Sequence, residues 1–144
     1  MDNKRRNICL VSVILLSFIS CTAPEETASI PITAGGYEIE IVSAEVTGEY
    51  ESEMGIWTSN EEDIEMAIIT YTVSWVGGGE QTPWEPLDFI LYDEEGNEYG
   101  HDTVMDFSDV DEPDKRGVMF NVKKGSKLKE LVIVDDVTFD LAGK

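Results

Sequence analysis

Residues 64–76 read IEMAIITYTVSWV, and the side chains of this stretch alternate between apolar and smaller polar types. The apolar positions that share one face of an extended chain are Ala67, Ile69, Tyr71, Val73 and Trp75. The positions that share the opposite face are Thr70, Thr72 and Ser74. A period of two, rich in β-branched and aromatic residues, is typical of a strand with one buried face. We therefore expect a central strand here, ended by the three glycines at residues 77–79.

The same period continues on both sides of this stretch. Apolar residues alternate with glutamates over residues 37–41, and the apolar phase then moves by one position from Val42 onward. Such a shift indicates a β-bulge or a strand that changes sheets. Further strands are expected at residues 87–92, 98–105, 118–122, 131–133 and 137–141. About seven short strands joined by turns predict an all-β sandwich or barrel.

The N-terminus has the organisation of an export signal. Lys4, Arg5 and Arg6 precede an apolar run at residues 8–19, and a serine and Cys21 follow. A positive start, a short apolar region and a small residue before the cut are typical of a secretory signal peptide. A membrane-spanning helix needs about 20 apolar residues, which is more than this run supplies.

Residues 18–21 (FISC) resemble the bacterial lipobox, whose cysteine becomes the lipidated first residue of the mature chain. Phe18 stands where the lipobox usually has Leu. The resemblance implies lipidation of Cys21 and a place in the cell envelope, outside the cytoplasm. In a Gram-negative cell it implies the outer membrane, because Thr22 rather than Asp follows the cysteine. An uncleaved signal anchor and an ordinary secretory signal are the alternatives.

This interpretation divides the chain into three parts. They are a signal peptide at residues 1–20, the lipidated cysteine with a flexible tether at residues 21–35, and one domain at residues 36–144. The tether is short, polar and contains proline, as linkers do. Its lipid makes the membrane the first expected partner, because more than one acyl chain gives stable attachment.

The chain is strongly acidic, with a formal charge of −20. Removing residues 1–20 takes away three basic residues and one acidic residue and leaves −22. Such a charge argues against nucleic-acid partners, whose phosphates it repels, and favours cationic partners or divalent cations. The part after Cys21 has no further cysteine. We therefore expect its stability to come from packing without a disulfide.

Residues 89–93 read FILYD and match the Phe-x-Leu-Tyr-Asp motif of FxLYD-type bacterial domains. The wider pattern resembles the DUF4352 group of exported domains. It continues with a turn at residues 93–96 and a later stretch formed by Gly117, Phe120, Val122 and Gly125. The resemblance covers residues 36–141. It implies an immunoglobulin-like antiparallel β-sandwich on an exported lipoprotein, and it carries no catalytic residues.

An acidic loop at residues 106–114 (DFSDVDEPD) is the candidate metal site. Ca²⁺ takes six to eight oxygen ligands, which such a loop can supply, although the spacing does not fit an EF-hand. The candidate ligands are Asp106, Asp109, Asp111, Glu112 and Asp114. The alternative is a solvated loop that binds no ion. No other cofactor is expected.

Two further features are candidates for contact with a partner. The segment 49–63 is acidic and irregular, and we expect either a mobile, solubilising loop or a surface for a basic partner. The aromatic residues least tied to core positions are Tyr50, Trp57, Trp84 and Tyr99. Loop aromatics either anchor a ligand or cap the ends of a sandwich. Trp84 and Trp57 are the candidate partner-binding residues, with Trp84 first because it lies between two prolines.

The sequence carries no catalytic signature. His101 is the one histidine, so neither a zinc site nor a catalytic triad has a convincing set of residues. We expect a lipid-anchored, non-catalytic binding module that contacts an envelope protein, a surface polymer or itself. The alternative is a Ca²⁺-dependent carbohydrate binder or a small envelope enzyme that uses the acidic loop.

Overall fold

The computed structural model describes residues 29–52, 55–84, 88–109, 111–133 and 137–143, and every regular element there is a β-strand. The predicted signal peptide, Cys21 and the first part of the predicted tether lie outside the described residues. In the described ranges, no helix is long and apolar enough to cross a membrane.

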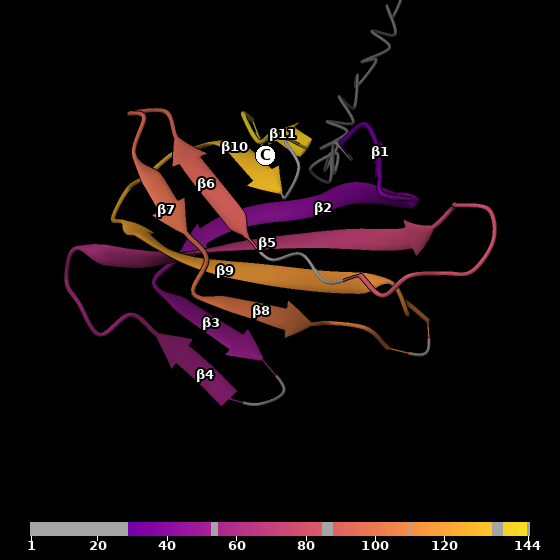
Figure 1. Ribbon diagram of the computed structural model, residues 1–144. Helices are drawn as coiled ribbons and strands as arrows, with labels where there is room; N and C mark the ends of the chain where they lie inside the picture. The colour runs from indigo at the N-terminus through magenta and orange to yellow at the C-terminus, as the bar shows by residue number, and fades with distance from the viewer. Residues whose placement is uncertain (1–28, 53–54, 85–87, 110, 134–136, 144) are drawn as a thin grey trace, which may run out of the picture.

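Two antiparallel sheets face each other across one core (Figure 1). The first sheet holds, in spatial order, β1 (Ile32–Ala34), β2 (Tyr37–Thr47), β5 (Ile64–Trp75), β9 (Lys115–Lys123) and β8 (Thr103–Asp106). The second holds β11 (Val137–Asp140), β10 (Leu128–Ile133), β6 (Phe89–Asp93) and β7 (Glu98–Gly100). The predicted all-β sandwich is confirmed.

The core forms where the predicted face of β5 meets the second sheet. Ala67, Ile69, Tyr71 and Val73 are buried, as their alternation predicts. The rings of Tyr71 and Phe89 lie 5.8 Å apart and join the two sheets. The second sheet contributes the buried side chains of Phe89, Leu91, Leu131, Ile133 and Phe139. Because buried apolar area is the dominant favourable term in folding, this face sets the fold.

The shift of apolar phase in β2 is a bulge. Ile41 pairs with Tyr71, Ser43 pairs with Thr70, and Val42 between them has no partner in the β2–β5 register. After the bulge, Ala44 and Val46 turn toward the core and pack against it. The predicted bulge is confirmed, because one extra residue exchanges the two faces of a strand.

Eleven strands occur in the described residues, against the roughly seven expected. The predicted strand 98–105 is two strands, because β7 pairs with β6 and β8 pairs with β9. The predicted tether is also too long at its C-terminal end. Its residues 32–34 form β1, which pairs with β2. Ser29, which precedes β1, is also bound to β2, because its Oγ accepts a hydrogen bond from the Ile41 N–H at 2.7 Å.

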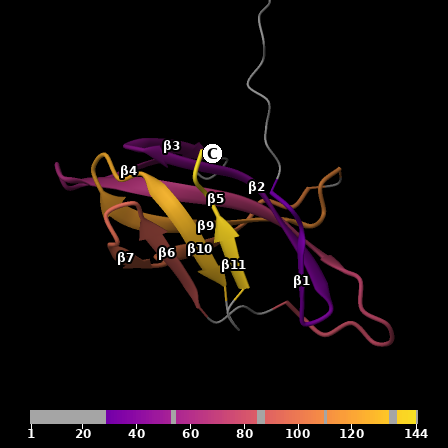
Figure 2. The same ribbon diagram turned by 90° about the horizontal axis from the view of Figure 1, so that it is seen from above.

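A hairpin of β3 (Glu49–Ser52) and β4 (Gly55–Thr58) adds a third layer on the outer face of the five-stranded sheet (Figure 2). The prediction of an irregular segment was therefore wrong for these residues. The cause lies on the sheet, whose outer face carries buried Met66, Ile68 and Met119. Tyr50 of β3 packs against this cluster and holds the hairpin on the outer face of the sheet.

Candidate functional site

Trp84 lies in the loop after β5, and it lines a surface hollow together with Asp114 of the loop before β9. Its ring meets Tyr37 edge-on, with ring centroids 5.2 Å apart, and Tyr37 meets Trp75 in the same way at 5.1 Å. The Tyr37 hydroxyl donates to the carbonyl of Thr82. These contacts hold the loop onto the start of β2.

Glycine leaves room for the third ring of this group. A side chain at either glycine would collide with this ring. A Cβ added at Gly36 would lie 2.5 Å from the Trp75 ring, and one added at Gly77 would lie 2.6 Å from it. The Val76 and Gly77 N–H groups both donate to the Gly36 carbonyl at 2.9 Å. The backbone therefore closes tightly around Trp75, which fixes the base on which Tyr37 and Trp84 rest.

A surface hollow of about 330 Å³, the Trp84 hollow, opens beside these rings. It is lined by Tyr37, Val73, Gln81, Pro83, Trp84, Asp114 and Arg116. The hollow therefore combines aromatic surface with an amide, a carboxylate and a guanidinium. These groups come from the starts of β2 and β9, the end of β5 and two loops. Ligand sites commonly combine apolar walls with a few converging polar groups.

Trp84, which lines this hollow, and Tyr71, which lies in the core, each carry a buried polar atom without a hydrogen-bond partner among the described residues. These atoms are the Trp84 Nε1 and the Tyr71 Oη. Burial raises the pKa of the Tyr71 hydroxyl, while Trp84 and Arg116 nearby act to lower it. The hydroxyl and the indole N–H therefore approach each other without reaching full hydrogen-bond geometry. Leaving such a buried group unpaired costs roughly 1–3 kcal/mol, so an acceptor oxygen in this place is stabilising.

The charged groups of the hollow are held in place by the fold. The Asp114 Oδ2 accepts a hydrogen bond from the Ser74 Oγ at 2.8 Å, and its backbone carbonyl accepts one from the Val73 N–H at 3.0 Å. The Arg116 Nη1 donates to the Lys115 carbonyl at 2.8 Å and to the Asp106 Oδ1 at 3.2 Å. Side chains that are already fixed in the free protein lose less conformational entropy when a ligand binds.

The candidate calcium ligands have separate partners. The Asp109 Oδ1 accepts from the N–H groups of Asp111 and Glu112 at 2.8 and 2.7 Å. Glu112 pairs with Lys115 at 2.9 Å. Hydrogen bonds from Ser108 lower the pKa of the Asp106 carboxyl, and Arg116 lowers it further.

In the part of the chain that the structure describes, no three His, Cys, Asp or Glu residues form a group that could hold a metal ion. Of the five predicted ligands, the structure brings Asp114 to the Trp84 hollow. The calcium site stays a prediction, which melting temperatures with Ca²⁺ and with a chelator will test.

The other aromatic candidates lie elsewhere. Trp57 lies on β4 with 39% of its surface exposed, and its indole N–H donates to the Ser52 Oγ at 3.2 Å. Tyr99 packs against the main core. The His101 ring lies edge-on to Phe89, with centroids 5.7 Å apart, at the predicted strand edge after β7.

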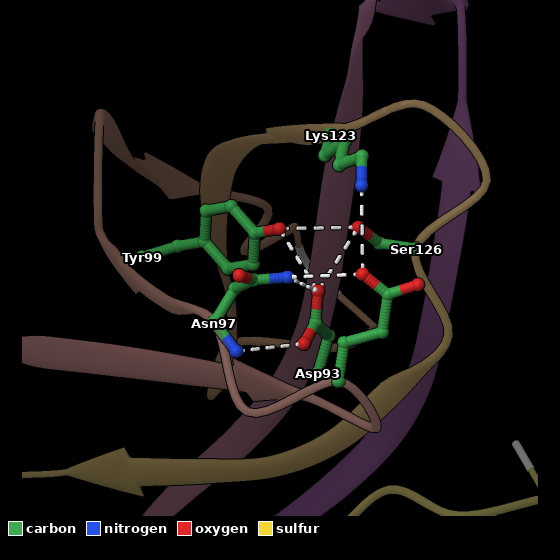
Figure 3. A network of polar contacts seen from close by, with 6 residues as sticks. Asp93, Asn97, Tyr99, Lys123 and Ser126 are labelled. Atoms are coloured by element: carbon green, nitrogen blue, oxygen red, sulfur yellow. Dashed lines mark hydrogen bonds and ion pairs between the residues drawn. The ribbon is translucent and has the colours of Figure 1, made fainter.

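Sequence reasoning did not single out a buried carboxylate at Asp93, which is 1% exposed (Figure 3). Its oxygens accept from the Asn97 backbone and side chain at 2.9 and 2.8 Å, from the Tyr99 hydroxyl at 2.9 Å and from the Ser126 hydroxyl at 3.3 Å. Burial by itself raises the pKa of Asp93. The hydrogen bonds from Asn97, Tyr99 and Ser126 outweigh burial and lower that pKa from 3.8 to about 2. The network joins the turn after β6 to the turn after β9.

Sequence reasoning also missed Tyr71 and Arg116 as site residues. Arg116 carried a usable signal, because it is the one arginine after residue 20 in a strongly acidic chain. Tyr71 carried none, since its place in the alternation of β5 is that of an ordinary core residue.

Comparisons of the chain with protein-family models, with curated proteins and with solved structures find no match. The resemblance to the FxLYD and DUF4352 domains stays a prediction.

Proposed function

We propose that this chain is a lipid-anchored cell-envelope protein whose sandwich is a non-catalytic binding module, with the Trp84 hollow as its binding site. The observation that carries the binding role is the convergence of Trp84, Gln81, Asp114 and Arg116 on one hollow, where the buried Trp84 indole N–H has no hydrogen-bond partner among the described residues. Native proteins rarely leave buried donors unpaired, and such groups often mark functional places.

The chemistry of the hollow favours an oxygen-rich ligand, such as a saccharide of a surface polymer. The Arg116 guanidinium and the Gln81 side-chain amide, which both line the hollow, are hydrogen-bond donors. Trp84 and Tyr37 add aromatic surface on which an apolar sugar face rests. Of the described residues that line the hollow, Asp114 is the one carboxylate. Hydrolysis of glycosides ordinarily uses two, so the set of residues supports binding rather than cleavage.

Residues 1–21 support the location, through the positive start, the short apolar run and the lipobox resemblance at residues 18–21. In this proposal, residues 22–31 connect the lipid to β1 and hold the acidic domain away from the membrane surface. Without residues 1–20 the net charge is −22, which is compatible with that separation because an anionic membrane surface repels such a domain.

Calorimetric titration with saccharides released from surface polymers of the source envelope tests the binding site. We expect Trp84→Ala to weaken binding at least tenfold, and Arg116→Gln to weaken it because the guanidinium that lines the hollow is lost. Trp57→Ala is the matched control and should bind as the wild type does. Equal affinity of the wild type, Trp84→Ala and Arg116→Gln would contradict the assignment of the site.

Fractionation of cells tests the anchor. We expect the wild-type protein in the membrane fraction, with a mass that lacks residues 1–20 and carries acyl chains on Cys21. Cys21→Ser should lose both the acyl chains and the cut before residue 21. If Cys21→Ser is processed and retained in the membrane like the wild type, the lipoprotein proposal is wrong.

A further inference from the structure

A second hollow, of about 360 Å³, lies between the β3–β4 hairpin and the outer face of the five-stranded sheet. We call it the hairpin groove. Its lining residues are Trp57, Thr58, Ser59, Asn60, Glu61, Ile64, Met66, Asp102, Met119 and Asn121. It shares no lining residue with the Trp84 hollow and lies on the other face of the sheet.

The hairpin groove has an apolar floor and an exposed apolar wall. Met66 and Met119 are buried at 3% and 4% exposure, whereas Trp57 on β4 is 39% exposed. Large apolar side chains grouped at a surface commonly mark a place where another molecule binds. Methionine is unbranched and polarisable, so a methionine floor adapts to side chains of different shapes.

The border of the hairpin groove is acidic. Glu61 and Asp102 line it directly. Within the described ranges, neither of these two carboxylates takes part in an ion pair. Their charges are therefore available to a partner, and they select a cationic one.

From these observations we propose that the hairpin groove binds a cationic amphipathic peptide segment. An apolar side chain of that segment enters between Trp57, Met66 and Met119. Its lysine or arginine side chains pair with Glu61 and Asp102 at the border. The apolar contact supplies most of the specificity, while the net charge of −20 raises the association rate of any cationic partner. This proposal does not depend on the Trp84 hollow.

The test uses a synthetic peptide of leucine and lysine with helical spacing, and a scrambled peptide of the same composition. Isothermal titration at 50 and 300 mM NaCl measures the affinity of the protein for both peptides. We expect the wild type to bind the amphipathic peptide at least tenfold more tightly than the scrambled one at 300 mM NaCl. Scrambling keeps the charge and removes the apolar face, so this comparison separates the groove from general attraction.

Three variants locate the site. Trp57→Ala should weaken binding of the amphipathic peptide at least fivefold, and its exposed position leaves the core intact. Asp102→Asn should reduce the salt dependence of binding. Trp84→Ala is the matched control, because that residue lies on the opposite face of the sheet. Equal binding of the two peptides, or a Trp57→Ala affinity equal to that of the wild type, overturns the proposal and leaves the Trp84 hollow untouched.

Discussion

Asp93 is a buried carboxylate that remains ionised because four hydrogen bonds surround it. Its donors come from Asn97 in its own turn, from Tyr99 on β7 and from Ser126 in the turn after β9. Removing the acceptor leaves several donors partly buried and unpaired. Lys123 and Glu95, 3.5 Å apart beside this network, are mostly exposed and contribute far less.

Asp93→Ala should lower the free energy of unfolding by roughly 1–3 kcal/mol, the cost of leaving buried hydrogen-bonding groups without partners. Urea unfolding followed by tryptophan fluorescence measures the change. Glu95→Ala is the control and should change stability by less than about 1 kcal/mol, as exposed ion pairs do. An Asp93→Ala protein as stable as Glu95→Ala would show that the network adds nothing to stability.

The lowered pKa of Asp93 predicts a specific loss of stability in acid. The pKa is about 2 in the folded chain and 3.8 ordinarily, so the unfolded chain binds the proton first as pH falls. The stabilisation is fully present above about pH 4 and is lost as pH falls toward 2. The stability difference between wild type and Asp93→Asn, measured by urea unfolding from pH 6 to pH 2.5, should therefore shrink at the acid end. A difference independent of pH would contradict the assignment.

At the level of elements, the β3–β4 hairpin shows how a short, acidic segment becomes ordered. Two strands of four residues are marginal by themselves in water. Tyr50 supplies the missing contact, since it packs on Met66, Ile68 and Met119 and meets the Phe107 ring at 6.4 Å. Burial raises the pKa of the Tyr50 hydroxyl, which agrees with the position of Tyr50 between the hairpin and the sheet.

Tyr50→Ala should destabilise the hairpin more than the sandwich. We expect amide hydrogen exchange to speed up in β3 and β4, and global stability to fall by about 1–2 kcal/mol, because the side chain is only partly buried. Glu51→Ala is the control, since Glu51 is exposed on the same strand. Unchanged exchange in β3 and β4 would mean that another contact orders the hairpin.

At the level of the whole molecule, charge acts against compactness. The chain has 30 acidic and 10 basic residues, and like charges repel more strongly in the folded state. Salt screens that repulsion over about 10 Å at 0.1 M.

Raising NaCl from 10 to 300 mM should therefore increase the urea midpoint of unfolding without changing the denaturant dependence. The measurement is a pair of urea titrations at pH 7 in the two salt concentrations. A chain in which repulsion is the dominant electrostatic effect gains stability with salt. A fall in the midpoint would instead show that attractive pairs dominate.

Several features of the fold could be predicted from sequence because they depend on neighbouring residues. The alternation in β5 predicted its buried face, and the phase shift after Ile41 predicted the bulge. The break between β7 and β8 could not be predicted in the same way. Residues 98–105 were predicted as one strand, and pairing with β6 on one side and β9 on the other divides them.

The candidate site was predictable only in part. Trp84 was selected from its place between prolines, and the structure shows that it lines a surface hollow. Its role in binding a partner stays a proposal. Tyr71 and Arg116 join it because they are directly opposite each other in the β5–β9 register. The β5–β9 register cannot be predicted from a short stretch of sequence, because it is set by hydrogen bonds between strands far apart in the chain.

The sequence by itself determined the strand period, the buried face of β5, the acidic charge and the thiol-free body, because each is a property of neighbouring residues or of composition. The tertiary structure decided which sheet each strand joins, that β3 and β4 cover the outer face, and that β1 belongs to the fold. It also decided that Arg116 lies opposite Tyr71 in the sheet and lines the same hollow as Trp84. These outcomes depend on pairing and burial between distant segments, which local alternation does not specify.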